Sequence, residues 1–151
     1  MQLVVVTPRG SKVDTDVAMV TVPGEVGELG ILPGHRPLIT ALAIGMLSYN
    51  EGGKTRHLAT NEGFAEVHDD KVVVVTESAE DPDEINAERA RKALEDAEAK
   101  LKTIDPHADP VGWKQTNEKR ARALNRLAVS RFATPEALRI QQERQAAQAR
   151  T

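Results

Sequence analysis

The feature that most constrains the fold is a sharp change of residue type along the chain. Nine of the ten glycines lie before residue 64, and the runs of valine end at Val75. Alanine, arginine and glutamate dominate after that point. β-branched residues between glycine turns favour strands, whereas alanine and long polar side chains favour helix. We therefore predict an α+β chain in which an N-terminal antiparallel β-sandwich precedes a C-terminal antiparallel two-helix hairpin.

The predicted boundaries follow this change of residue type and the prolines near it. The β-sandwich domain should occupy residues 1–82, the helical hairpin residues 83–134, and a basic tail rich in Gln, Ala and Arg residues 135–151.

The first domain shows short β-branched runs that end at glycine, proline or acidic turn residues. Two of its turns, Glu51-Gly52-Gly53 and Asp69-Asp70, indicate hairpins. The glycine-rich segment 24–30 lacks a following helix and contains acidic residues that would repel phosphate, so we expect a turn between strands there. The strands are expected at residues 3–7, 17–22, 46–50, 54–60, 64–68 and 71–76.

The second domain shows the spacing of two amphipathic helices. The first should start near Asp83-Glu84 and stop before Asp105-Pro106. Its apolar seam consists of Ala90, Leu94, Ala97, Leu101 and Ile104. The second should run from residue 111 to about residue 132, with one side formed by Trp113, Ala121, Leu124 and Ala128.

A seam made largely of alanine buries little apolar surface, so we expect a hairpin that is held weakly and can open. After Thr134-Pro135, the tail is expected to form either a third short helix or a frayed end.

Charge and composition exclude several functions. Residues 1–82 carry 6 basic and 12 acidic residues, whereas residues 114–151 carry 9 basic and 3 acidic residues. The acidic first domain and an aromatic content of 3% argue against binding of nucleic acid. The basic second helix is either an ordinary solvated surface or a cationic surface that docks on an acidic protein.

Catalytic chemistry is not indicated by any motif. The chain has no cysteine, its four histidines lack metal-ligand spacing, and its serines lie outside any nucleophile motif. We therefore expect no catalytic residues, no metal and no cofactor. The apolar run Leu3–Val6 is too short for a secretion signal or a membrane span, so the chain should stay in the compartment where it is made.

Two motifs carry a resemblance to a known family. Residues 27–38 read GELGILPGHRPL, and residues 63–67 read GFAEV, followed by the valine run 72–75. Over about residues 1–133 the chain resembles the epsilon subunit of bacterial F-type ATP synthases. The resemblance implies a flattened sandwich of about ten strands followed by two antiparallel helices.

The resemblance also implies a function. The chain would be a non-catalytic central-stalk (rotor) subunit of a proton-translocating ATP synthase, coupling rotation of the c ring to ATP synthesis. Its partners would be the gamma subunit, which packs on an apolar face of the sandwich, and the c-subunit ring, which Glu28 and His35 would face. It would lie on the cytoplasmic face of the bacterial inner membrane and associate with the membrane only through the complex.

In some members of this family the hairpin extends into the catalytic sector and blocks ATP hydrolysis. The resemblance then implies that Arg120, Arg122 and Arg126 contact the alpha and beta subunits when the hairpin is extended.

Some members also bind ATP on the folded hairpin. The matching positions here are Glu80, Ile85, Asn86, Arg89, Arg122 and Arg126. Asn86 stands where the motif has an aspartate, and Asp96 stands where a basic residue is found, so both changes argue against tight binding. The alternative functional hypothesis is a stand-alone nucleotide-sensing protein with the same two domains.

Overall fold

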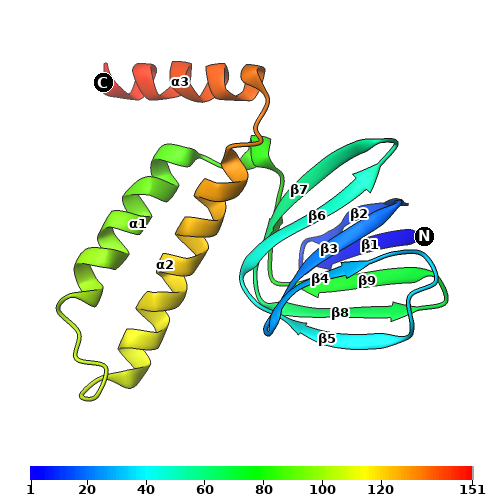
Figure 1. Ribbon diagram of the computed structural model, residues 1–151. Coiled ribbons are helices and arrows are strands. Elements are labelled where there is room, and N and C mark those ends of the chain that lie inside the picture. The colour runs from blue at the N-terminus through cyan, green and yellow to red at the C-terminus, as the bar shows by residue number, and fades with distance from the viewer. Residues whose placement is uncertain (151) are drawn as a thin grey trace. The chain divides into compact units, whose positions relative to one another are not determined.

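The computed structural model describes residues 1–150, which form two compact units (Figure 1). The first unit spans Met1–Glu80 and consists of strands, and the second starts at Asp81 and consists of helices. The predicted α+β fold, a β-sandwich followed by a helical hairpin, is confirmed, and a third helix is added to it.

Ten strands form the first unit within residues 1–80. They are β1 (Gln2–Thr7), β2 (Gly10–Asp16), β3 (Met19–Gly24), β4 (Gly27–Ile31), β5 (Leu38–Leu42), β6 (Gly45–Glu51), β7 (Lys54–Thr60), β8 (Gly63–His68), β9 (Lys71–Thr76) and β10 (Ala79–Glu80). The pairing order is β10-β7-β6-β3-β5-β8-β9-β1-β2, and β4 pairs with the other side of β3.

The pairings divide this sheet into two halves. β3 and β5 are joined only through the pair Gly24 and Leu42, whereas the other neighbours share longer ladders, apart from the short β10. One neighbouring pair, β1 and β9, is parallel, and the remaining pairs are antiparallel. Two halves joined at one corner can fold face to face and enclose a core.

Alternate residues along the strands point into this core. Leu3 and Val5 of β1 are completely buried, as are Val72 and Val74 of β9, because side chains in a strand alternate between two faces. The other half of the sheet contributes Val20, Val22, Leu47, Tyr49 and Leu58 to the same cluster. The apolar runs of β1 and β9 are continuous in the sequence, so the structure rather than the residue pattern shows which of their members face the core.

Both predicted hairpins are present. Gly52 and Gly53 have φ angles of 57° and 79°, and they connect β6 to β7. Asp69 and Asp70, with φ angles of 49° and 59°, connect β8 to β9. Positive φ at both central residues matches the twist of a two-residue hairpin, and aspartate tolerates this conformation better than most residues.

The prediction of a turn across residues 24–30 is wrong in its second half, because Gly27–Ile31 forms β4 and pairs with β3. Strands β2, β5 and β10 were also not expected. β2 is polar and largely exposed, so it shows little of the apolar alternation that marks a half-buried strand.

The second unit contains three α-helices and one short 3-10 turn within residues 81–150. These elements are η1 (Pro82–Glu84), α1 (Ala87–Leu101), α2 (Pro110–Ser130) and α3 (Pro135–Ala149). The predicted start of the first helix at Asp83-Glu84 is wrong by one turn. Asn86 instead caps α1, because its side-chain oxygen accepts a hydrogen bond from Arg89 N at 3.1 Å.

Helices α1 and α2 lie side by side as an antiparallel hairpin (Figure 1). The predicted seam of α1 is confirmed, since Ala90 and Ala97 are buried and its leucines are partly buried. The predicted side of α2 is wrong: Leu124 is 40% exposed, whereas its neighbour Ala123 is buried. A shift of one residue turns a helix by about 100°, so the alanine rather than the leucine lies in the interior.

Candidate interaction surfaces

Strand β4 and the loop that follows it hold the residues expected to face the c ring. Glu28 is exposed on β4, opposite Pro23 of β3. His35 is partly exposed in the turn, where its backbone N–H donates to Leu32 O at 3.1 Å. The same turn contains Gly34, whose φ of 82° favours glycine.

A carboxylate from another turn supports this loop. Gly34 N donates to Asp70 Oδ1 at 3.3 Å, and the Asp70 backbone oxygen accepts from Gln2 N at 3.1 Å. The N-terminal ammonium of Met1 lies 3.8 Å from Asp70 Oδ2. The β8–β9 hairpin turn therefore connects the start of β1 to the loop that carries His35.

An apolar surface covers the outside of strands β5, β8 and β9. Ile39 is 72% exposed and Phe64 is 48% exposed. Phe64 lies opposite Ala41 on one side and Val75 on the other. We call this surface the outer apolar face, and it comprises Ile39, Ala41, Phe64, Val73 and Val75, with the exposed carboxylate of Glu66 between Ile39 and Val73. A group of exposed apolar side chains on neighbouring strands indicates a surface that another molecule covers.

The three arginines expected on the inhibitory helix do not share one side of α2. Arg122 and Arg126 are four residues apart and lie on the same side, and both are partly exposed. Arg120 lies on a different side, where its Nε is 3.5 Å from Glu98 Oε1 of α1. In the folded hairpin, Arg120 is therefore engaged across the two helices.

The residues that match nucleotide-binding positions have structural roles of their own. Ile85 is completely buried, and its backbone oxygen accepts a hydrogen bond from the Gln141 side-chain amide. The side-chain oxygen of Asn86 caps α1 and so already accepts a hydrogen bond. Arg89 is exposed. Glu80 belongs to the first unit, and the other five residues belong to the second.

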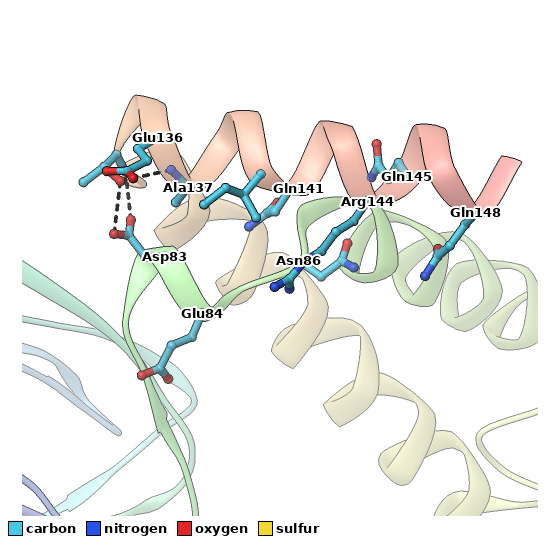
Figure 2. Close-up of a pocket in the computed structure, with 11 residues that line it drawn as sticks. Asp83, Glu84, Asn86, Glu136, Ala137, Gln141, Arg144, Gln145 and Gln148 are labelled. Atoms are coloured by element: carbon cyan, nitrogen blue, oxygen red, sulfur yellow. Dashed lines mark hydrogen bonds between the residues drawn. The ribbon is translucent and has the colours of Figure 1, made fainter. Parts of the chain in front are cut away.

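A groove that the sequence did not indicate lies between the start of α1 and the third helix (Figure 2). It has a volume of about 510 Å³ and is lined mainly by polar side chains. Asp83 accepts hydrogen bonds from Thr134 at this site, through the backbone N at 2.8 Å and through Oγ1 at 3.1 Å. The Thr134-Pro135-Glu136 segment is a helix-start signal, but the sequence gives no sign that Asp83 is its partner.

One histidine pairs with a serine across two strands. Ser48 Oγ lies 2.8 Å from His57 Nδ1 on the directly opposed positions of β6 and β7. Burial lowers the pKa of His57 below its ordinary value of 6.5. A nucleophilic serine of the elbow type lies on a sharp turn, whereas Ser48 lies inside a regular strand. We therefore interpret this pair as a structural contact between neighbouring strands.

Two further findings concern metal sites and membrane spans. Within residues 1–150, no group of three His, Cys, Asp or Glu residues is arranged to hold a metal ion. None of the helices in this described part of the chain is both long and apolar enough to cross a membrane.

Both units match models of one protein family. Residues 1–82 match the beta-sandwich domain of the ATP synthase delta/epsilon chain, and residues 83–131 match the long alpha-helix domain of the same chain. The chain belongs to the ATP synthase delta/epsilon family. It is therefore an epsilon-type subunit and has a structural rather than a catalytic part in ATP synthase.

Individual relatives agree with this assignment. The ATP synthase epsilon chain of Geobacter metallireducens is 44% identical over 129 residues, which cover 85% of this chain and 92% of the relative. That of Geobacter sp. strain M21 is 40% identical over 134 residues, covering 89% and 96%. A chain in the structure of the Euglena gracilis mitochondrial ATP synthase, OSCP/F1/c-ring, superposes with a TM-score of 0.71 at 30% identity, covering 82% of this chain and 76% of that one.

Proposed function

We propose that this family member is a central-stalk (rotor) subunit of a proton-translocating F-type ATP synthase. It couples rotation of the c ring to ATP synthesis and lies at the cytoplasmic face of the bacterial inner membrane through the complex. Membership in the delta/epsilon family and similarity to a chain of a solved OSCP/F1/c-ring assembly support this proposal.

The outer apolar face is the observation that carries the proposal. A subunit that transmits rotation must be attached firmly to the shaft, and this face offers an apolar contact area on regular strands. Each 100 Å² of apolar surface removed from water contributes about 2.5 kcal/mol. We assign this face to the gamma subunit.

Strand β4 and the loop after it are assigned to the c-subunit ring. Exposed Glu28 supplies a negative charge that suits a basic loop, and His35 lies in a turn that Asp70 supports. A supported loop loses less conformational freedom on binding than a mobile one.

The helical hairpin is assigned a regulatory role, in which its extension toward the alpha and beta subunits inhibits ATP hydrolysis. Most of its buried apolar residues are alanines, Ala90, Ala97 and Ala123, with Val129 near the end of α2. A buried methyl group contributes less than the roughly 1.5–3 kcal/mol typical of a buried leucine. Arg120 would leave Glu98 on extension and join Arg122 and Arg126 as a cation for acidic segments of the partner subunits.

Co-purification of the ATP synthase complex tests the proposal. The Phe64→Asp variant places a charge in the outer apolar face, and the Val111→Asp variant places the same charge on an exposed valine of α2. We expect Phe64→Asp to lose gamma and c subunits from pull-downs of the tagged chain and Val111→Asp to keep them. Retention of both partners by a folded Phe64→Asp variant would contradict the assignment of this face.

The alternative, a stand-alone nucleotide sensor, makes a different prediction. It requires the isolated protein to bind ATP with micromolar affinity, which isothermal titration measures. We expect no such binding, because Asn86 supplies an amide where a carboxylate acceptor is needed and Asp96 places a negative charge where a basic residue is found.

A further inference from the structure

The folded hairpin has one end that the chain does not connect. Residues 102–109 join the end of α1 to the start of α2, whereas the start of α1 and the end of α2 meet without a covalent link. Asp83 lies just before α1, and Thr134 lies just after α2. The two hydrogen bonds from Thr134 to the Asp83 carboxylate therefore close the open end of the hairpin (Figure 2).

Helix α3 adds a second attachment at the same end. The Gln141 side-chain amide donates a hydrogen bond to the backbone oxygen of Ile85, at the entrance to α1. Ala137, Gln141 and Gln145 are four residues apart and partly buried, so they form the side of α3 that faces inward. The third helix thus contacts the segment before α1 at two places, although it follows α2 in the chain.

These attachments are polar and therefore reversible. No residue of α3 is buried, and a groove of about 510 Å³ remains beside it, so apolar packing contributes little to holding it in place. Thr134 has two functions, because its Oγ1 donates to Asp83 and also accepts from Ala137 N at 3.3 Å as the cap of α3. Release of Asp83 should consequently loosen the first turn of α3 as well.

We propose that α3 is a clasp that holds the α1–α2 hairpin closed and so opposes its extension. The clasp consists of the Asp83–Thr134 and Gln141–Ile85 contacts. It rests on the proposed inhibitory function of the hairpin. Helix α3 lies after residue 131, the last residue that the family model matches, whereas its contacts Asp83 and Ile85 lie within the matched range. In this chain the balance between folded and extended hairpins then depends on an element outside the matched domain.

Spin labels on the full-length protein test the clasp directly. The chain contains no cysteine, so Lys92→Cys on α1 with Ala147→Cys on α3 forms a unique pair, and Lys92→Cys with Lys119→Cys reports α1 against α2. We expect Asp83→Ala and Gln141→Ala to broaden the α1–α3 distance distribution. The matched control is Gln142→Ala, which removes an exposed glutamine one position along the same helix and should leave the distances unchanged.

Amide hydrogen exchange provides a second readout. Loss of two hydrogen bonds at Asp83 should speed exchange of the Thr134 amide by about tenfold, and Asp83→Asn, which keeps an acceptor oxygen, should recover part of the protection. Wild-type distances and wild-type exchange in both Asp83→Ala and Gln141→Ala would overturn the clasp.

ATP hydrolysis by the reconstituted complex separates the clasp from the function on which it rests. If both are right, Asp83→Ala and Gln141→Ala lower hydrolysis severalfold, Gln142→Ala does not, and deletion of residues 83–151 raises it. A deletion that raises hydrolysis, together with clasp variants that leave it unchanged, would overturn the clasp alone. A deletion without effect would overturn the inhibitory function, while the label distances would still decide whether α3 holds the hairpin closed.

Discussion

At the scale of single residues, Gly63 shows why one position of the family-like GFAEV segment has no side chain. A Cβ atom built on Gly63 would lie 1.9 Å from Val75 O and 2.9 Å from Thr76 Cα, both of which belong to the backbone of β9. Backbone atoms of a paired strand cannot move away as the end of a side chain can. The glycine therefore permits the close approach of β8 and β9.

The Gly63→Ala substitution should lower the free energy of unfolding by about 1–3 kcal/mol or more, because the added methyl group overlaps the neighbouring strand. Urea denaturation measures this change. The control is Gly30→Ala, whose Cβ would meet only the flexible end of Met19, at 3.2 Å. Equal stabilities for the two variants would show that β8 and β9 can separate at little cost.

His57 should make stability depend on pH. Its pKa is lowered from 6.5 by burial, so the unfolded chain takes up a proton at a higher pH than the folded one. Its contribution is fully present above about pH 6.5 and is lost as the pH falls through the lower pKa of the folded state. In urea denaturation at several pH values, His57→Asn should therefore reduce the loss of stability on acidification.

The Ser48→Ala variant is the control for this measurement, since it removes the hydroxyl beside His57 but not the burial that lowers the pKa. We expect it to keep the dependence on pH. A His57→Asn variant with the wild-type dependence would show that another group is responsible.

At the scale of elements, the ends of the helices were harder to predict than their existence. Acidic residues favour a helix start, which led to the expectation that the first helix begins at Asp83. Asn86 instead provides the cap, because its side chain reaches Arg89 N, while the carboxylate of Asp83 is used by Thr134. Local composition indicates that a helix start is near, whereas the available hydrogen-bond partners decide the residue.

The Asn86→Asp substitution should have two effects on α1. A carboxylate cap interacts favourably with the helix dipole and should raise stability by about 0.3–1 kcal/mol. It also restores the carboxylate of the nucleotide motif, so isothermal titration should detect stronger ATP binding than in the unaltered protein. Asn86→Ala should lose about 1 kcal/mol with the cap and gain no ATP binding. If Asn86→Asp does not bind ATP more strongly than the unaltered protein, residue 86 is not the position that limits ATP affinity.

At the scale of the whole molecule, the helical unit can be deleted without removing the β-sandwich unit, so the proposed inhibition can be tested apart from assembly. Deletion of residues 83–151 leaves the β-sandwich unit, whose core lies within residues 1–80. We expect complexes with this deletion to assemble and to hydrolyse ATP about fivefold faster or more, a size typical of coupling between sites. Unchanged hydrolysis by an assembled complex would show that the helices are not inhibitory in this protein.

The sequence by itself determined the features that depend on neighbouring residues. The hairpin at Asp69-Asp70 and the alanine-rich seam of α1 could be read from local spacing, whereas the continuous valine runs of β1 and β9 predicted strands but not which of their residues face inward. These patterns arise because strand and helix have fixed periods, so they are present in any short window of the chain.

Only the tertiary structure decided which distant segments meet. Three features could not be predicted from the spacing of residues along the chain. They are the parallel pairing of β1 with β9, the side of α2 on which Ala123 is buried, and the contact of Asp83 with Thr134, 51 residues apart. Each depends on the geometry that the remaining chain imposes once it has folded. The contacts of the proposed clasp could not be predicted from the sequence either. Many pairs of polar residues can form a hydrogen bond, and only the folded structure shows which of them lie close enough to do so.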